Sequence, residues 1–352
     1  MYPSDLGFHM PPEWEKHMST LMEWPCREAE WPGPFEEILE AYSKAALTIA
    51  TFEPVLMLVN KENIEEAKRY CKDKIKLVEI GHDDSWMRDN GPTFIKKGKD
   101  ELAGINWRFN AWGGKYPFAQ DGLVATKVLN MLGIPTFDAP FILEGGSIHV
   151  DGEGTMLTTE ECLLNINRNP SITKEELEEE LKRYLGISKI IWLKEGLFGD
   201  DTDGHIDNVA SFASPGVVLL QTTNDKNNPN YERTLRNIEI LENSTDAKGR
   251  KLQIVELPQP DVEEYNGINL TLSYMNFYFV NGGIVLPVFG GKHKKTDEEA
   301  VSVLREVFKE RIVVTIDGLQ LIRGGGNVHC LTQQLPIGVP SNSLLEGVKC
   351  EK

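Results

Sequence analysis

Polar turns recur along this 352-residue chain at a nearly regular interval, and this recurrence restricts its possible folds more than any other feature. The turns centre on Asp89, Glu144, His205, Asn276 and Cys330, so successive turns lie 55, 61, 71 and 54 residues apart. Each interval holds roughly two strands, a helix and a further strand. Such units cannot bury their own apolar faces and must pack on one another, and five units of about 70 residues that close into a ring would account for the whole length.

The hydrophobic pattern predicts a mixed α/β class. Strand-like runs alternate with helical stretches, and the runs are Pro54–Asn60, Ile75–Gly81, Thr93–Lys97, Leu102–Asn110, Ile190–Leu193, Val217–Thr222, Leu252–Leu257, Met275–Val280, Gly283–Val288 and Ile312–Ile316. The unit after Asn208 is the clearest, with a hairpin to Thr222, a helix over about 230–242 and a strand to Leu257. We predict one domain, residues 1–352. An ordinary α/β sheet with irregular insertions is the alternative.

Two helices carry start signals. Thr173 with Glu176, and Thr296 with Glu299, fit the capping box, in which a hydroxyl and a carboxylate satisfy free N–H groups at a helix start. Gly186 is placed to end the first helix. Apolar residues follow at helical spacing, namely Leu177, Leu181, Leu185, Ala300, Leu304, Val307 and Phe308. These apolar stripes predict core positions.

The net charge of the chain restricts the kinds of molecule that it is expected to bind. A formal net charge of -17 disfavours nucleic acid and anionic membranes, which are bound by clustered Lys and Arg, and it is compatible with steering a cation inward. Acidic residues that merely keep the protein dispersed explain the charge equally well. The N-terminal region has no basic stretch before an apolar run, and no window of 18 apolar residues occurs. We therefore expect a cytoplasmic protein without a membrane span.

Cysteine usage points to a single reactive thiol. The five cysteines are Cys26, Cys71, Cys162, Cys330 and Cys350, and no pair has the spacing of a zinc site or suggests a disulfide framework. Cys162 is expected in an apolar strand and Cys71 in a helix, and Cys26 and Cys350 have equally ordinary positions. Cys330 follows a glycine turn, so its side chain is expected to be presented rather than packed.

A guanidinium substrate would explain the residues on the polar turns. This planar, permanently charged group needs carboxylates in its plane, which Asp89, Glu144 and Asp207 could supply. Its central carbon is open to a thiolate above the plane, and the departing nitrogen needs a proton. Cys330 and His205 suit these two roles.

Each residue also has a structural explanation. Asp89 could stabilise its turn, Glu144 could pair with an arginine, and His205 with Asp207 could form a surface turn. Cys330 could be a buried apolar residue. We predict a structural role for His329, because it faces away from Cys330 if the segment is a strand. The joint occurrence of these residues on similarly spaced turns favours a functional site.

Two other kinds of site are disfavoured. Gly324-Gly325-Gly326 lacks the Lys and Ser/Thr of a phosphate loop and leads into a strand rather than a helix. A metal site made of Glu144, His205, Asp207 and Cys330 would combine hard carboxylates with a thiolate and an imidazole, which is an unusual ligand set.

Seven segments together resemble the agmatine deiminase family, within the guanidine-modifying superfamily that includes the bacterial-type peptidylarginine deiminases. They span nearly the whole chain and are His9–Glu15, Trp86–Pro92, Phe109–Tyr116, Glu144–Ser147, Gly204–Asn208, Ser273–Phe277 and Gly324–Cys330. The resemblance implies a pentein-type fold, a five-bladed pseudo-symmetric α/β propeller with the active site in its central channel. It implies neither a metal nor an organic cofactor, and it makes a homo-oligomer plausible.

The resemblance also implies roles for single residues. Cys330 would be the nucleophile, His205 the general acid and base, and Asp89 and Asp207 the carboxylates that grip the guanidinium. Glu144 would assist His205 or the substrate. Trp86 and Trp112 would line the pocket.

The implied reaction is the hydrolytic deimination of agmatine to N-carbamoylputrescine and ammonia through a covalent thiouronium on Cys330. Polyamine biosynthesis and energy recovery from agmatine are both open as its pathway. A deiminase for arginine or peptidyl-arginine is the main alternative. A non-catalytic polyamine-binding protein is the alternative from another class.

Asp201 is the candidate partner of the distal ammonium of the substrate. It precedes the Gly204-His205 pair, as an acidic residue does in agmatine-using relatives. The chain departs from a common family pattern, which has Glu at the position of Asp201 and Asn at that of Asp203. The shorter reach and the extra charge leave the partner of the distal ammonium open.

The acidic pocket predicts substrate-assisted activation of the thiol. Neighbouring carboxylates raise the pKa of a thiol and disfavour the reactive thiolate. An incoming cation offsets their field, so we expect it to promote ionisation of Cys330.

Overall fold

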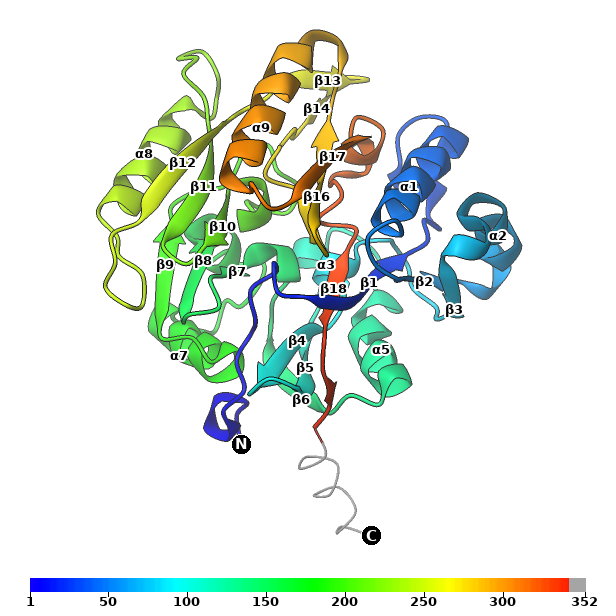
Figure 1. The fold of residues 1–352 in the computed structure, drawn as a ribbon, viewed down its shortest axis with the longest axis horizontal. Helices are drawn as coiled ribbons and strands as arrows, with labels where there is room; N and C mark the ends of the chain where they lie inside the picture. Colours follow the sequence, from blue (N-terminus) through cyan, green and yellow to red (C-terminus); the bar gives the residue numbers. More distant parts are fainter. Residues whose placement is uncertain (342–352) are drawn as a thin grey trace.

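The computed structural model describes residues 1–341, and Cys350 lies outside this range. Figure 1 shows small sheets that follow one another in chain order around the middle of the molecule, with the longer helices on the outside. Strands and helices alternate along the chain, and the mixed α/β class predicted from the sequence is confirmed.

Four consecutive sheets share one order of elements: an antiparallel pair of strands, a helix, and a strand parallel to the second of the pair. They are β4 (Thr93–Lys97), β5 (Glu101–Arg108), α5 (Val124–Leu132) and β6 (Thr136–Ile142); β7 (His149–Val150), β8 (Thr155–Thr159), α7 (Lys174–Leu185) and β9 (Lys189–Leu193); β10 (Ala210–Ser214), β11 (Val217–Thr222), α8 (Tyr231–Glu242) and β12 (Gln253–Pro258); and β15 (Tyr278–Val280), β16 (Gly283–Val288), α9 (Lys294–Val307) and β17 (Ile312–Asp317). The predicted ββαβ unit is therefore present.

A fifth sheet joins the two ends of the described chain. β18 (Gln333–Pro336) pairs antiparallel with β1 (His17–Glu23), and α1 (Phe35–Ile49) leads to β2 (Val55–Val59), which runs parallel to β1. α2 (Ile64–Cys71) leads to β3 (Lys76–Glu79), which pairs with β2 and extends this sheet. β19 (Val339–Pro340) pairs with β5. A hairpin of β13 (Glu263–Tyr265) and β14 (Ile268–Leu270) lies between the third and fourth of the units described above. The fifth unit is thus completed by β18, near the end of the described chain, and by β1, near its start.

The hydrophobic core is divided among the contacts between neighbouring units. Within residues 1–341, clusters of buried side chains join consecutive sheets, and pairs of members are Leu58 with Val128, Ile105 with Met156, Leu193 with Phe212, Leu219 with Leu286, and Val285 with Met57. The last pair joins the β15–β17 sheet to the β1 sheet. Because each sheet buries apolar surface against the next, this cyclic packing supports the five-bladed arrangement that the repeat predicted.

The polar turns occupy equivalent places in this arrangement. Asp89, Glu144, His205, Asn276 and Cys330 each lie a few residues before the first strand of a unit. Equivalent positions of a cyclic repeat lie at the same end of the ring. Side chains distant in sequence are therefore brought to one place.

The first predicted helix start is confirmed. The Thr173 hydroxyl accepts the N–H of Glu176 at 3.2 Å, and the Glu176 carboxylate accepts the N–H of Thr173 at 2.9 Å, which completes the capping box of α7. Gly186 ends the helix in the left-handed conformation, at φ 63°.

Three other local predictions are wrong. α9 is capped at His293, and Thr296 lies inside its first turn, where its hydroxyl donates to the carbonyl of His293. Cys162 lies on the short helix α6 (Glu160–Leu163) rather than in a strand. Met275 precedes its strand, which begins at Tyr278.

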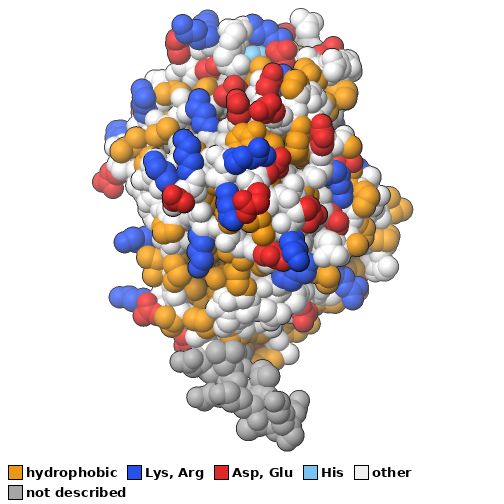
Figure 2. All heavy atoms as spheres, turned by 90° about the vertical axis from the view of Figure 1, so that its right-hand side faces the viewer, with side chains coloured by type: hydrophobic (Ala, Val, Ile, Leu, Met, Phe, Trp, Pro, Cys, Tyr) orange, Lys and Arg blue, Asp and Glu red, His pale blue; other side chains and the backbone are white. Residues whose placement is uncertain are grey.

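The outer surface shows no single dominant charge on the face drawn in Figure 2. There, Lys and Arg side chains are interspersed with Asp and Glu and with hydrophobic side chains. None of the helices in residues 1–341 combines the length and hydrophobicity needed to cross a bilayer.

The capping box gives a stability prediction. We expect Thr173→Ala to lower the free energy of unfolding by about 1 kcal/mol, because the N–H of Glu176 loses its acceptor. Thr173→Ser keeps the hydroxyl and should lose much less. Urea unfolding of the two variants measures the difference, and equal losses would show that the hydroxyl does not cap α7.

Candidate active site

A pocket of about 420 Å³ lies where the polar turns meet. Its lining residues are Glu30, Asp84, Trp86, Asp89, Trp112, Tyr116, Asp201, Thr202, Gly324, Gly325, Gly326 and Cys330. Five residues selected from the sequence are thus in the wall: Trp86, Asp89, Trp112, Asp201 and Cys330. The remaining three, Glu144, His205 and Asp207, are buried behind it. His205 contacts Asp89 of the wall, Asp207 contacts Cys330 of the wall, and Glu144 contacts His205.

Cys330 is fixed by hydrogen bonds rather than freely presented. It lies in a turn just before β18 and is only 3% exposed, which corrects the expectation of an unpacked side chain. The Asn276 side-chain carbonyl accepts the N–H groups of His329 and Cys330 at 3.1 and 3.3 Å. The Asn276 amide nitrogen donates to the Cys330 Sγ at 3.1 Å. Asn276 therefore holds both the backbone and the sulfur of Cys330.

The glycines before Cys330 allow close packing. A Cβ added at Gly326 would lie 2.6 Å from the Trp86 ring and 3.0 Å from the Cys330 Sγ. Only a residue without a side chain fits between the indole and the sulfur.

Asp89 and Asp207 place carboxylates beside the thiol. Asp89 accepts the N–H of Gly146 at 2.9 Å with one oxygen and the indole N–H of Trp112 at 2.9 Å with the other. The Asp207 Oδ2 lies 3.5 Å from the Cys330 Sγ. The Asp207 Oδ1 is buried and has no hydrogen-bond partner among residues 1–341. A buried acceptor without a partner is costly unless a ligand supplies a donor.

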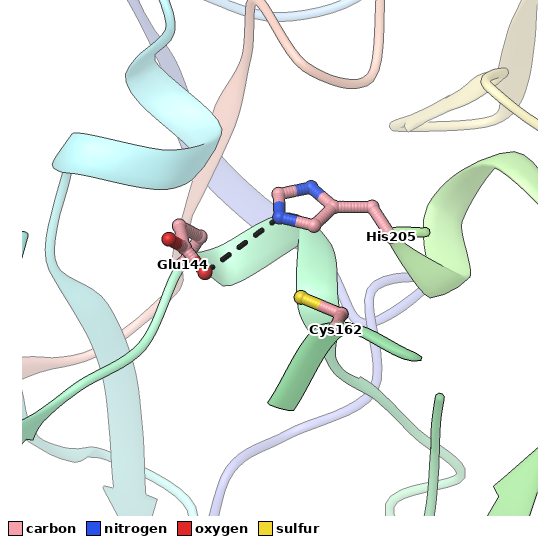
Figure 3. A group of neighbouring side chains, drawn as sticks. All are labelled: Glu144, Cys162 and His205. Atoms are coloured by element: carbon pink, nitrogen blue, oxygen red, sulfur yellow. Dashed lines mark ion pairs between the residues drawn. The ribbon is translucent and has the colours of Figure 1, made fainter. Parts of the chain in front are cut away.

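His205 lies between two carboxylates. Its Nδ1 is 3.8 Å from the Asp89 Oδ1, and its Nε2 is 3.7 Å from the Glu144 Oε2, the ion pair drawn in Figure 3. The other Glu144 oxygen accepts from the Arg168 Nε at 2.8 Å. The pairing with arginine that sequence analysis allowed for Glu144 is therefore real, yet it leaves one oxygen facing the imidazole.

The field of these groups sets the protonation of the free protein. Burial raises the pKa of the Cys330 thiol, and Asp207 and Asp89 raise it further, to well above its usual range. Burial alone lowers the pKa of His205, but Asp89, Cys162 and Glu144 outweigh this effect and raise it well above its usual range. At neutral pH the free site therefore holds a neutral thiol and a protonated imidazole.

The carboxylates differ in protonation. Burial raises the pKa of Asp207 and of Glu144, but His329 at Asp207, and His205 with Arg168 at Glu144, more than offset it and lower both values. The pKa of Asp89 is raised by burial, although His205 acts against this. Asp89 is thus the carboxylate whose charge is least compensated in the free site.

The far end of the pocket carries a further carboxylate. Asp201, with about half of its side chain exposed, accepts from the Tyr116 hydroxyl at 2.9 Å, and the Lys115 Nζ lies 3.7 Å away. Asp203 instead pairs with Arg168 at 2.6 Å and with Lys115 at 3.0 Å. The extra acidic residue at position 203 is neutralised within the protein, which leaves Asp201 as the better candidate for a ligand cation.

Aromatic side chains form the side wall. The Trp86 ring stacks on Trp31 with centroids 5.2 Å apart and rings 9° from parallel, and it meets Trp112 edge-on at 6.5 Å. Indole faces suit the planar guanidinium and the alkyl chain of such a ligand.

Residues that the sequence analysis left out of the site also contact it. His329 lies in a turn, not a strand, so the argument that it faces away does not hold. Its Nδ1 is 2.9 Å from the Asp207 Oδ2 and its Nε2 is 2.9 Å from the Glu13 Oε1. Asn276 was recognised only as a member of the repeat. Two features of the sequence could have indicated these contacts: Asn276 lies on one of the polar turns, and Glu13 lies in the first of the seven segments.

The side chains that lie close enough to hold a metal ion differ from the four considered from the sequence, which were Glu144, His205, Asp207 and Cys330. In the described part of the chain, Glu144 and His205 approach each other together with Cys162, rather than with Asp207 and Cys330. One potential ligand atom from each of the three lies within 4.8 Å of the others.

Comparisons with known proteins agree with this geometry. Residues 9–336 match the family model described as Porphyromonas-type peptidyl-arginine deiminase. The agmatine deiminase of Ectopseudomonas mendocina is 45% identical over 94% of this chain and 96% of its own length. A solved structure described as the agmatine deiminase of Enterococcus faecalis catalysing its reaction has a TM-score of 0.91 and 35% identity, and covers 96% of this chain and 98% of its own.

A solved C. jejuni agmatine deiminase, a cysteine-to-serine variant with substrate bound, has a TM-score of 0.85 and 29% identity, and covers 94% of this chain and 97% of its own. These structural matches confirm the pentein-type α/β fold class.

The raised pKa of Cys330 gives a reactivity prediction. We expect a neutral haloacetamide to alkylate Cys330 slowly at pH 7, and a cationic haloacetamidine to react much faster, because its charge offsets the field of Asp89 and Asp207. Each rate is divided by the rate with a small free thiol and followed across pH by mass spectrometry. Equal normalised rates, with a free-protein thiol pKa below about 7, would contradict the expectation.

Proposed function

The chain belongs to the Porphyromonas-type peptidyl-arginine deiminase family, and on this basis we propose that it hydrolyses agmatine to N-carbamoylputrescine and ammonia. The observation that carries the proposal is the meeting of a thiol, an imidazole and two carboxylates at a pocket with another carboxylate at its far end. These groups belong to Cys330, His205, Asp89, Asp207 and Asp201.

Substrate binding begins with the guanidinium. Asp89 and Asp207 flank the thiol, and the Asp207 Oδ1 is the buried acceptor that lacks a partner among the described residues. Guanidinium N–H donors in the plane of these carboxylates satisfy the acceptor and compensate the buried charge. The central carbon of the guanidinium then lies next to the Cys330 Sγ.

The first half of the reaction releases ammonia. The bound cation lowers the pKa of Cys330, the thiol proton leaves to solvent, and the thiolate forms a C–S bond to the guanidino carbon. The tetrahedral intermediate collapses, the C–N bond breaks, and protonated His205 gives its proton to the departing nitrogen. A thiouronium remains on Cys330.

The second half regenerates the thiolate. His205, now neutral, takes a proton from water, and the resulting hydroxide attacks the thiouronium carbon. The tetrahedral intermediate collapses, the C–S bond breaks, the proton of its hydroxyl group leaves to solvent, and the neutral ureido product departs. Glu144, 3.7 Å from the His205 Nε2 and fixed by Arg168, stabilises the imidazolium form that both halves require.

The far end of the pocket favours agmatine over arginine. Asp201, Glu30 and Asp84 line the pocket, and burial together with all three carboxylates raises the pKa of Tyr116, whose hydroxyl donates to Asp201. Three carboxylates suit the distal ammonium of agmatine and repel the α-carboxylate of arginine. Lys115, the nearby cation, lies closer to Asp203, at 3.0 Å, than to Asp201, at 3.7 Å.

The proposal also includes one catalytic domain over residues 1–352, action without a metal or organic cofactor, and assembly into a homo-oligomer. The relatives named agmatine deiminase support the substrate class.

The activity is tested by measuring ammonia and ureido product from agmatine, arginine and a blocked arginine peptide, with a chelator present. We expect turnover of agmatine alone and its loss, by roughly 1000-fold or more, in Cys330→Ser, which lacks a thiolate nucleophile. Turnover of another guanidine would overturn the substrate assignment, and full activity of Cys330→Ser would overturn the mechanism. Binding of agmatine without turnover by the native protein would favour a binding protein.

The role of Asp201 gives a separate prediction. We expect Asp201→Asn to raise the KM for agmatine roughly 3- to 10-fold with a smaller change in kcat, because a half-exposed ion pair with the distal ammonium is lost. Asp201→Glu keeps the charge and should retain a near-native KM. Butylguanidine, which lacks the distal ammonium, provides the control substrate. An equal rise in KM for both substrates would show that Asp201 does not contact the ammonium.

A further inference from the structure

Cys162 has no part in the proposed reaction, yet it lies beside the general acid and base. Figure 3 shows its sulfur next to the His205 ring, with the Glu144 carboxylate completing the group. One ligand atom from each side chain lies within 4.8 Å of the others, and all three side chains are fully buried.

Two of these side chains have polar atoms without hydrogen-bond partners. Among residues 1–341, both ring nitrogens of His205 and the Glu144 Oε2 lack one. Buried polar atoms without hydrogen-bond partners are uncommon in proteins. The His205 Nε2 and the Glu144 Oε2 face each other at 3.7 Å beside the Cys162 thiol, which indicates a place for a ligand.

The surrounding structure holds the three side chains in this arrangement. The Thr159 hydroxyl accepts the N–H of Cys162 at 3.2 Å and donates to the Gly204 carbonyl at 2.6 Å, which ties α6 to the turn that carries His205. Arg168 holds the Glu144 Oε1 at 2.8 Å, so the Oε2 keeps its direction toward the imidazole. A ligand arriving at this point therefore meets a preformed set of donor atoms.

The donor set selects the kind of ligand. One thiolate, one neutral imidazole and one carboxylate are the ligand types that Zn²⁺ takes in proteins, with a fourth position left for water. The two anionic ligands also balance the charge of a dication in a buried site. We propose that Glu144, Cys162 and His205 form a binding site for Zn²⁺ or a similar thiophilic dication, and that its occupation reversibly inhibits the enzyme.

Inhibition follows from the identity of the ligands. A metal ion on the His205 Nε2 takes the place of the proton there and withdraws Glu144 from the ring. The imidazolium form that both halves of the proposed reaction require then cannot form. The acidic pocket next to the site attracts dications, and Asp89 of its wall lies 3.8 Å from the His205 Nδ1. The inhibition therefore rests on the proposed function, whereas the binding does not.

Binding is tested without activity by titrating Co²⁺ into Cys330→Ser protein, which lacks the pocket thiol. We expect a thiolate-to-cobalt charge-transfer band at one equivalent, displaced by Zn²⁺, and its loss in Cys330→Ser/Cys162→Ala. Cys330→Ser/Cys26→Ser, which lacks a partly exposed cysteine elsewhere, is the matched control and should keep the band. Absence of the band in Cys330→Ser, or its persistence after Cys162→Ala, would overturn the site. Thermal unfolding without metal checks that the variants are folded.

Inhibition is tested with the native thiol in place. We expect Zn²⁺ to inhibit agmatine turnover reversibly, with activity restored by a chelator, and Cys162→Ala to raise the inhibition constant roughly 10-fold or more, measured against the variant's own turnover without metal. An unchanged inhibition constant in Cys162→Ala would overturn the inhibitory role of this site. A native protein that binds cobalt but turns over no guanidine would instead count against the proposed function alone.

Discussion

Uncompensated negative charge buried where the five units meet is the constraint on which the rest of the site depends. Glu144 has Arg168 as a cationic partner and Asp207 has His329. Among residues 1–341, Asp89 is paired with no cation other than His205, 3.8 Å away, and the Asp207 Oδ1 has no donor. The same field keeps the thiol of Cys330 neutral and His205 protonated. A planar cation with several N–H donors is the ligand that relieves all of these conditions together.

The fold makes this concentration of charge possible by distributing the core around it. Each sheet packs on the next through its own cluster of apolar side chains, and β18 pairs with β1 so that the turn of Cys330 is anchored to the first unit. The polar turns are then held by strands on both sides, and hydrogen bonds such as those from Asn276 fix the reacting atoms. Rigid support of this kind is required for catalytic groups that must stay within a fraction of an ångström of their working positions.

Much of this arrangement could be predicted from the sequence, because a cyclic repeat puts equivalent turns in one place and the residue types on the turns point to guanidine chemistry. The local features that the sequence does not predict depend on contacts between residues far apart in the chain. β1 was missed because His17 and Thr20 are buried by hydrogen bonds to Glu53, so the strand has no apolar alternation. The strand geometry that would turn His329 away from Cys330 does not apply, because the segment is a turn. The capping pattern at Thr296 lies inside α9, because the helix already begins at Lys294.

The central claim is that the buried carboxylates recognise the charge of the guanidinium, and one pair of binding constants tests it most directly. Agmatine and N-carbamoylputrescine share the same chain and ammonium and differ in whether the other end is a guanidinium or a neutral ureido group. Calorimetry with Cys330→Ser protein should give an affinity for agmatine at least about 100-fold higher, because unpaired buried charge is costly. Equal affinities would contradict the account, since the site would then not depend on the cation.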